Sequence, residues 1–292
     1  MRGNAEAHEL IAPGSLPAVL DLLASAPGEW TPLAGGTEVM VAFAAGRLGA
    51  QKLVNLWGIP DLRFIRTTSS SIVIGACTTF LDLRAHADLA AELPLIAKSA
   101  SWIGSVANQS RATLGGNLAN GSPAADSSPA LLVYDAEIEM VSKRGSRRIP
   151  YAEFHTGYKQ NVMAPDELLY AIHLPRRFAD HRHYLRKVGT RRAMAISKVA
   201  LAASTLLEDG VVSEIRLAAT SLAPFPTRLF KTEAVLLGQP LTNEALLEAR
   251  GALFAEAQPI DDIRSTANYR KHVVANLLHE FLLGLSAEGA SR

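Results

Sequence analysis

The sequence has 292 residues, of which 29 are Lys or Arg and 28 are Asp or Glu, so its formal net charge is +1. This balance argues against nucleic acid as the main partner, because nucleic-acid-binding chains carry an excess of positive charge. With 48% hydrophobic and 20% charged residues, the composition is that of a soluble globular protein, and the length predicts two domains.

Cysteine occurs once, at Cys77. A single thiol cannot form an intrachain disulfide, hold an iron–sulfur cluster or complete a Cys-based zinc site, so we expect no metal site on this chain. Cys77 itself is expected to be a small buried core residue. The sequence shows neither a signal peptide nor an apolar run of the ~20 residues that span a bilayer, which predicts a cytoplasmic protein without a transmembrane segment.

The N-terminal part predicts a helix, a strand and a second helix in that order. Ser15 is a suitable N-cap for an apolar pattern at helical spacing, which Pro27-Gly28 ends. A strand is expected at residues 30–34, and a helix is expected to resume at residues 39–45 after the Gly35-Gly36 turn.

The rest of the chain predicts strands followed by helices, which is typical of an α+β fold. Strands are expected at residues 52–56, 71–76, 136–141, 168–174, 184–188 and 211–218. Residues 147–150 follow a turn, and residues 196–207 are apolar and precede a hairpin signal at Asp209-Gly210. Helices are expected at residues 79–89, 93–101, 126–134, 227–237, 244–256 and 266–283. Residues 111–123, rich in Gly, Asn and Ser, are expected to form a loop, and residues 286–292 a disordered tail.

Two glycine turns are the best functional candidates, at Gly35-Gly36 and at Gly115-Gly116. Adjacent glycines let backbone N–H groups converge into a nest for phosphate oxygens, and two nests suit a diphosphate better than a single phosphate. Taken alone, a Gly-Gly pair between a strand and a helix is more often plain turn chemistry. The sequence has neither the G-x-G-x-x-G fingerprint of a dinucleotide site nor the G-x-x-x-x-G-K-[ST] loop of a nucleotide triphosphatase.

Both glycine segments resemble the FAD loops of the flavoprotein (medium) subunit of molybdenum hydroxylases, the xanthine dehydrogenase and carbon monoxide dehydrogenase family. The similarity is carried by Pro-Leu-Ala-Gly-Gly-Thr-Glu-Val at residues 32–39 and by residues 112–126, which end in Ser-Pro-Ala-Ala-Asp. It continues through residues 168–175 and 184–192 and so covers nearly the whole chain.

The resemblance implies a fold like that of vanillyl-alcohol oxidase (PCMH-type). An FAD-binding domain is expected over residues 1–177, with subdomains of about 1–57 and 58–177. A C-terminal α+β domain of antiparallel sheet and helices is expected over residues 178–286, followed by a tail at 287–292.

The resemblance also implies which residues contact FAD, with the pyrophosphate lying across the two glycine loops. They are Pro32, Leu33, Ala34, Gly35, Gly36, Thr37, Glu38, Val39, Ile103, Thr113, Leu114, Gly115, Gly116, Asn117, Asp126, Leu169 and Lys187.

Four of these contacts have an alternative role. Ile103 stands where the xanthine dehydrogenase branch has an aromatic residue beside the flavin, and it suits the core equally well. Leu169 matches a residue that packs on the isoalloxazine ring, but a strand leucine is also a core residue. Asp126 matches a polar contact to the cofactor, and it could also cap the helix at 126–134. Lys187 would stabilise the anionic reduced flavin, or it is a solvated strand lysine.

The family implies an FAD-carrying electron-transfer subunit without catalytic acid–base residues of its own. It would accept electrons from [2Fe–2S] clusters of a small subunit and pass them to NAD, a quinone or oxygen. A large subunit would carry the molybdenum cofactor, and the whole would be a dimer of heterotrimers. Two alternatives stay open, which are a self-sufficient FAD-dependent reductase with the same fold and a non-redox nucleotide-binding module.

Two further groups are expected at the surface. His181 and His183 lack a carboxylate or thiol partner at ligand spacing and are interpreted as surface histidines. The basic residues between 143 and 148 are interpreted as the solvated tip of a hairpin, which could also meet an acidic partner chain.

Overall fold

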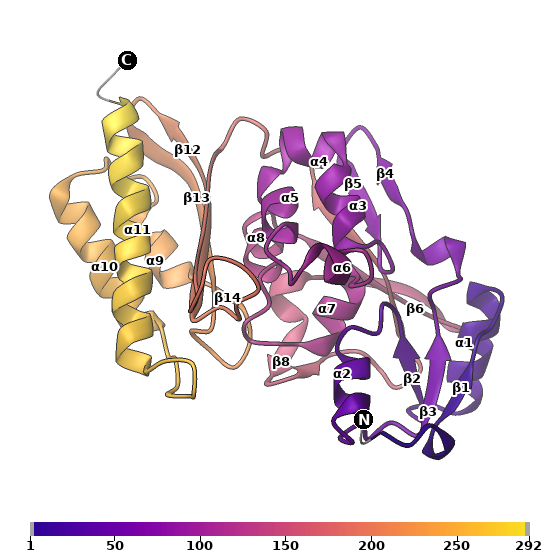
Figure 1. The fold of residues 1–292 in the computed structure, drawn as a ribbon. Coiled ribbons are helices and arrows are strands. Elements are labelled where there is room, and N and C mark those ends of the chain that lie inside the picture. Colours follow the sequence, from indigo (N-terminus) through magenta and orange to yellow (C-terminus); the bar gives the residue numbers. More distant parts are fainter. Residues whose placement is uncertain (1–2, 290–292) are drawn as a thin grey trace.

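The computed structural model describes the backbone of residues 3–289 and the side chains of residues 3–286. Three larger sheets follow one another along the chain, and Figure 1 shows them from the indigo N-terminal part to the yellow C-terminal part. Helices pack on all three, so the expected α+β fold is confirmed. No helix of the described range is long and apolar enough to cross a membrane.

The N-terminal sheet is parallel, in the order β1-β3-β2. Its strands are β1 (Glu9–Ile11), β2 (Trp30–Leu33) and β3 (Lys52–Asn55). Between β1 and β2 runs α1 (Leu16–Ser25), which begins where the sequence predicts because the Ser15 side chain accepts a hydrogen bond from the Ala18 amide. After β2 comes α2 (Val39–Ala44), and the glycine turn lies between them.

The central sheet is antiparallel, in the order β4-β5-β10-β6-β7. Its strands are β4 (Ile65–Thr67), β5 (Ser71–Gly75), β6 (Glu137–Ser142), β7 (Gly145–Pro150) and β10 (Leu168–Pro175). The helices beside it are α3 (Phe80–Ala85), α4 (Ala87–Glu92), α5 (Pro94–Ala100), α6 (Val106–Gln109), α7 (Leu114–Asn120) and α8 (Ser128–Val133). Residues before 178 also form a small hairpin of β8 (His155–Gly157) and β9 (Gln160–Asn161). They further include three short helices, η1 (Ala5–Ala7), η2 (Pro60–Leu62) and η3 (Tyr151–Glu153).

Two predictions were wrong here. The helix expected at residues 79–89 is divided into α3 and α4, because His86 has extended backbone angles. The loop expected at residues 111–123 contains α7, which Thr113 caps and Gly121 ends in a left-handed conformation with φ +61°. Leu114 and Leu118, one turn apart, are both fully buried, and this packing stabilises the helix despite its glycines.

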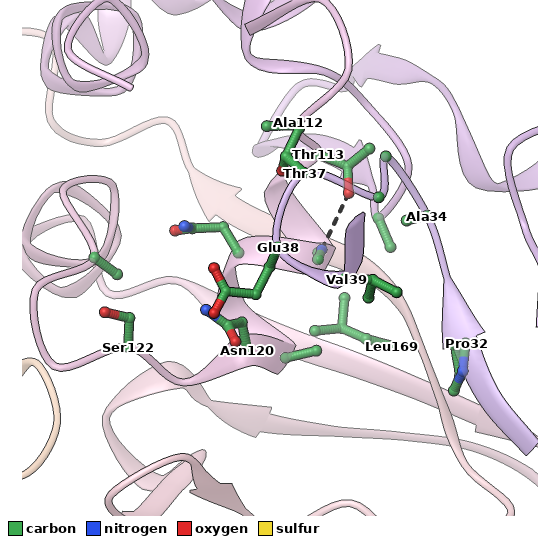
Figure 2. A pocket seen from close by; sticks show the side chains of 18 of the residues that line it. Pro32, Ala34, Thr37, Glu38, Val39, Ala112, Thr113, Asn120, Ser122 and Leu169 are labelled. Atoms are coloured by element: carbon green, nitrogen blue, oxygen red, sulfur yellow. Dashed lines mark hydrogen bonds between the residues drawn. The ribbon is translucent and has the colours of Figure 1, made fainter. Parts of the chain in front are cut away.

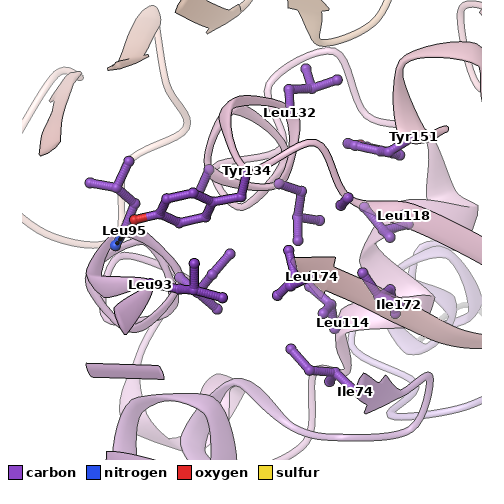
Figure 3. Close-up of a cluster of buried hydrophobic side chains, with 14 of the residues drawn as sticks. Ile74, Leu93, Leu95, Leu114, Leu118, Leu132, Tyr134, Tyr151, Ile172 and Leu174 are labelled. Atoms are coloured by element: carbon purple, nitrogen blue, oxygen red, sulfur yellow. Dashed lines mark hydrogen bonds between the residues drawn. The ribbon is translucent and has the colours of Figure 1, made fainter. Parts of the chain in front are cut away.

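The central core lies between these helices and the sheet (Figure 3). Ile172 and Leu174 of β10 contribute to it together with Leu114 and Leu118 of α7. The hydroxyl of Tyr134 is buried there and accepts a hydrogen bond of 3.2 Å from the amide of Leu95, so the polar end of this ring has a partner.

The C-terminal sheet is antiparallel, in the order β11-β12-β13-β14. Its strands are β11 (Arg182–Val188), β12 (Val199–Glu208), β13 (Val211–Thr220) and β14 (Thr227–Arg228), followed by α9 (Phe230–Leu236), α10 (Asn243–Glu256) and α11 (Ala267–Gly289). The helix expected from residue 227 thus starts as a short strand. The disordered tail expected from residue 286 is wrong for residues 286–289, because α11 continues to Gly289. Residues 290–292 of that tail lie outside the described range.

Both faces of the C-terminal sheet are buried. Val199, Leu201 and Ala203 of β12 pack towards α10 and α11, whereas Ala202 belongs to the central core that contains α8. Figure 1 shows α9, α10 and α11 on one side of β12 and β13 and α8 on the other. The boundary expected at residue 177 falls between β10 and β11, and the exact division into domains stays a prediction.

The two histidines near this boundary are not at the surface, so that interpretation was wrong. His181 is buried and its Nδ1 lies 3.0 Å from the Ser204 hydroxyl, while His183 packs edge-on against the Tyr134 ring. The segment between β10 and β11 is thus only partly exposed, because Phe178 and His181 are buried while Arg177, Ala179 and Asp180 are exposed. Burial lowers the pKa of His183 to about 4, so this imidazole is neutral at pH 7.

Of the basic residues expected at the tip of the hairpin β6–β7, Lys143 and Arg144 lie in its turn, whereas Arg147 and Arg148 belong to β7 itself. They also have partners. Arg144 pairs with Asp166, and Arg147 pairs with Glu167 at 2.6 Å. These acidic residues belong to the turn before β10, so the charge of the tip is compensated within the chain.

Candidate functional site

A cavity of about 960 Å³ lies where the N-terminal sheet, α7 and the C-terminal part meet. This volume is at the upper end of the range of small-molecule sites. All of the residues expected to contact FAD line it except Leu114 and Lys187. Contact with the cofactor itself stays a prediction for each of them.

The first glycine turn forms one wall of the cavity (Figure 2). Gly36 has φ +75°, which favours glycine, and a Cβ on Gly35 would lie only 1.7 Å from the carbonyl oxygen of Arg111. Within residues 3–289, none of the five amides of residues 35–39 donates a hydrogen bond to another group of the protein. We call residues 35–39 the amide segment. Five successive N–H groups without acceptors make it suitable for binding an anion.

The second glycine pair is different, and the expected second nest is wrong. Its amides are already used: Leu114 donates to the Thr78 carbonyl, Gly115 to the Ala76 carbonyl, and Gly116 to the Thr113 hydroxyl, which Figure 2 draws as a dashed line. The acceptors are the chain segment just after β5, which lies against the start of α7, and the side chain of the helix cap Thr113.

The two glycines of α7 instead allow close packing. A Cβ on Gly115 would lie 2.6 Å from the Cβ of Ala76, and one on Gly116 would lie 2.8 Å from the Thr113 hydroxyl oxygen and 3.8 Å from the Cβ of Ala34. The absence of side chains on both glycines therefore brings α7 up against β5 and the first glycine turn.

Asp126 lies in the cavity wall and is tied to the C-terminal part. It accepts hydrogen bonds from the ammonium of Lys187 and from the hydroxyl of Ser197. Burial raises the pKa of Asp126, and the two donors oppose that rise. Asp126 does not cap a helix, since α8 begins at Ser128 after Ser127. Nor is Lys187 a solvated lysine, because only 12% of its side chain is exposed. Lys187 does not line the cavity itself, but it pairs with Asp126, which does.

The expected apolar contacts divide between cavity and core. Leu169 is 4% exposed and lines the cavity, and Ile103 lines it while also packing against the central core. Leu114 is fully buried in the central core and does not reach the cavity. Cys77 is buried as expected, and burial raises the pKa of its thiol to about 12.

Several lining residues were not singled out from the sequence. They are Asn120 and Ser122 at the end of α7, Tyr158 and Lys159 at the tip of β8–β9, Met194 and Ile196 before β12, and Arg264 before α11. Asn120 and Ser122 lie inside the motif at residues 112–126, which could have indicated them. The others have no sequence signal, because the fold brings them to the cavity from distant parts of the chain.

Comparison with known proteins agrees with this architecture. Residues 6–177 match the family described as "FAD binding domain in molybdopterin dehydrogenase", and residues 184–285 match "CO dehydrogenase flavoprotein C-terminal domain". The chain belongs to the FAD-binding subunits of the molybdenum hydroxylase family. The resemblance seen in the glycine motifs is thereby confirmed.

Similar proteins support this assignment over nearly the full length of the chain. The xanthine dehydrogenase FAD-binding subunit of Escherichia coli O157:H7 is 32% identical over 88% of this chain and 89% of its own length. The carbon monoxide dehydrogenase medium chain of Hydrogenophaga pseudoflava is 28% identical over 94% of this chain and 95% of its own. A solved structure, reconstituted CO dehydrogenase from Oligotropha carboxidovorans, matches with a TM-score of 0.90 at 28% identity, covering 96% of this chain and 97% of that one.

The cavity of this FAD-binding subunit fits a dinucleotide. The amide segment offers donors to phosphate oxygens, and Gly35 lets it pass close to the backbone of Arg111. Leu169 and Ile103 offer apolar surface for a flat ring.

Proposed function

We propose that this subunit binds FAD in the cavity, with the diphosphate on the amide segment and the flavin ring against Leu169 and Ile103. The five free amides of residues 35–39 are the observation that carries the proposal. These residues line the cavity and are partly exposed to it, so their N–H groups without a protein acceptor are available to the phosphate oxygens of a ligand. Thr113, Asn117 and Asp126 would complete the site from the side of α7 and α8.

We further propose that the subunit carries electrons from [2Fe–2S] clusters of a small subunit to an external acceptor, within a dimer of heterotrimers that also contains a molybdenum-cofactor subunit. FAD supplies the redox chemistry, since it exchanges electrons singly or in pairs, and the protein binds and orients it. The Hydrogenophaga pseudoflava relative is named a medium chain, and its solved structure is described as lacking the Mo-pyranopterin moiety of the molybdenum cofactor.

The residues of this chain support such a division of labour. Its one thiol, Cys77, is buried and cannot hold a cluster alone. No group of three or more His, Cys, Asp or Glu side chains in the described part of the chain could hold a metal ion. The FAD-binding domain would span residues 1–177 and the C-terminal domain residues 178–286. The latter would contribute to the site through Lys187 and Ser197. The cytoplasmic location expected from the sequence stays a prediction.

FAD binding is tested by titrating the purified full chain into FAD and, separately, into FMN, with flavin fluorescence as the readout. We expect tighter binding of FAD, because FMN lacks the diphosphate and the adenosine. Equal affinity for the two flavins, or no binding of FAD, would contradict the proposed site.

Electron transfer is tested separately with the FAD-loaded chain. We expect the small [2Fe–2S] subunit, reduced with dithionite and freed from excess reductant, to bleach the flavin absorbance. A flavin that stays oxidised although the two subunits co-purify would contradict the proposed electron path.

A further inference from the structure

The charged side chains that line the cavity are of two kinds. Asp126, Glu167 and Arg264 are each held in an ion pair by a residue behind the wall. Within the described residues, Glu38 and Lys159 have only each other as polar partners, with the Lys159 ammonium 3.4 Å from a carboxylate oxygen of Glu38. Their side chains are 63% and 42% exposed, and an exposed pair of this kind holds its members weakly.

The backbone of Lys159 packs closely against a neighbouring element, whereas its side chain makes only the exposed ion pair. Lys159 lies at the tip of β8–β9 with φ +53°, and its Cα is 3.0 Å from the point where a Cβ on Gly121 would lie. Gly121 itself has φ +61° and ends α7. The hairpin tip thus rests on the end of α7, which only a glycine at this position allows.

The ion pair brings this lysine to the anion site. Glu38 is a member of the amide segment, and its carboxylate lies 3.4 Å from the Lys159 ammonium. Lys159 and the amide segment also line the same cavity. The amides carry only partial positive charge, whereas the diphosphate of a dinucleotide carries full negative charges. A carboxylate on the same segment repels that diphosphate and competes with it for the lysine.

From these contacts we infer that Lys159 is a positioning residue for the diphosphate of the cofactor, held by Glu38 in the free protein and transferred to the phosphate oxygens on binding. The inference rests on the proposed function, because it takes FAD as the ligand of the cavity. Lys159 would thereby favour FAD over flavins without phosphates, since only a phosphate can accept the lysine released by Glu38. Charge-assisted hydrogen bonds to phosphate are among the stronger polar contacts, which makes the effect measurable.

The test compares the affinities of full-length variants for FAD and for riboflavin, which lacks phosphates. We expect Lys159→Gln to weaken FAD binding about tenfold to a hundredfold and to leave riboflavin binding unchanged. Lys159→Arg should restore most of the FAD affinity. Glu38→Gln should raise it several-fold, because the competing carboxylate is gone. Lys143→Gln is the matched control, since Lys143 forms a similarly exposed pair with Asp21 and neither residue lines the cavity.

The outcomes separate this inference from the proposed function. If the natural chain binds FAD more tightly than riboflavin and Lys159→Gln does so equally well, the role of Lys159 is wrong and the FAD site stands. If the natural chain binds the two equally, the diphosphate site itself is wrong. If Glu38→Gln binds FAD more weakly than the natural chain, the claim that the Glu38 carboxylate competes with phosphate for Lys159 is wrong. A loss of riboflavin binding equal to the loss of FAD binding in Lys159→Gln would show a structural role instead.

Discussion

The carboxylate of Asp126 accepts a hydrogen bond from the ammonium of Lys187, which joins the cavity wall to the first strand of the C-terminal sheet. Their side chains are only 9% and 12% exposed. A second donor, the Ser197 hydroxyl, reaches the other oxygen of the same carboxylate. The pair therefore connects the proposed FAD-binding domain with the C-terminal one inside the protein, where an unpaired charge is costly.

Replacing Lys187 by Met leaves the carboxylate of Asp126 buried without its cation. We expect the free energy of unfolding to fall by about 3 kcal/mol, as for other broken buried pairs. Adding Asp126→Asn should recover part of this loss, because the orphaned charge is removed. Urea denaturation of the two single variants and the double variant measures the coupling, and strictly additive effects would contradict a direct interaction.

Gly35→Ala tests the amide segment. The new Cβ would lie 1.7 Å from the Arg111 carbonyl oxygen, so the backbone of the segment must move and its amides with it. We expect the purified variant to carry little or no FAD. Gly49→Ala is the control, since a Cβ there meets nothing within 4 Å, and it should keep the natural flavin content. Full flavin content in Gly35→Ala would exclude the segment from the site.

Acid should weaken the contact between Asp262 and the start of α11. Asp262 lies 2.9 Å from Arg264 Nε and 2.5 Å from an η nitrogen of Arg270, a residue that is only 2% exposed. Burial opposes ionisation of Asp262, but the arginine donors outweigh it and hold the pKa of this carboxyl well below its usual range. Because the unfolded value is about 3.9, the stabilisation is complete above that pH and is lost as the pH falls towards the folded value.

Asp262→Asn should remove this dependence. We expect the variant to be about 3 kcal/mol less stable at pH 7, since Arg270 loses its carboxylate, and to lose less stability between pH 5 and pH 3 than the natural chain. Thermal or urea unfolding across this pH range measures both effects. Parallel stability curves for the two proteins would contradict a role of Asp262 in the acid response.

The sequence by itself determined the features that depend on neighbours along the chain. Ser15 caps α1 because a serine side chain can reach an amide three residues on. The glycine motifs identified the family because the residues that resemble it, such as 32–39, are consecutive in the sequence and can be recognised without the structure. Each of these signals lies within a few residues and needs no knowledge of the fold.

Only the tertiary structure decided which side chains meet at the cavity. Asp126 finds Lys187 and Glu38 finds Lys159 across 61 and 121 residues of sequence, and no spacing encodes such pairs. The two Gly-Gly pairs look alike in sequence, yet the amides at residues 35–39 are free and those at 114–117 are bonded. The difference arises because Ala76 and Thr78, from a distant strand end, accept hydrogen bonds from the second pair's segment and nothing in the described chain does so for the first.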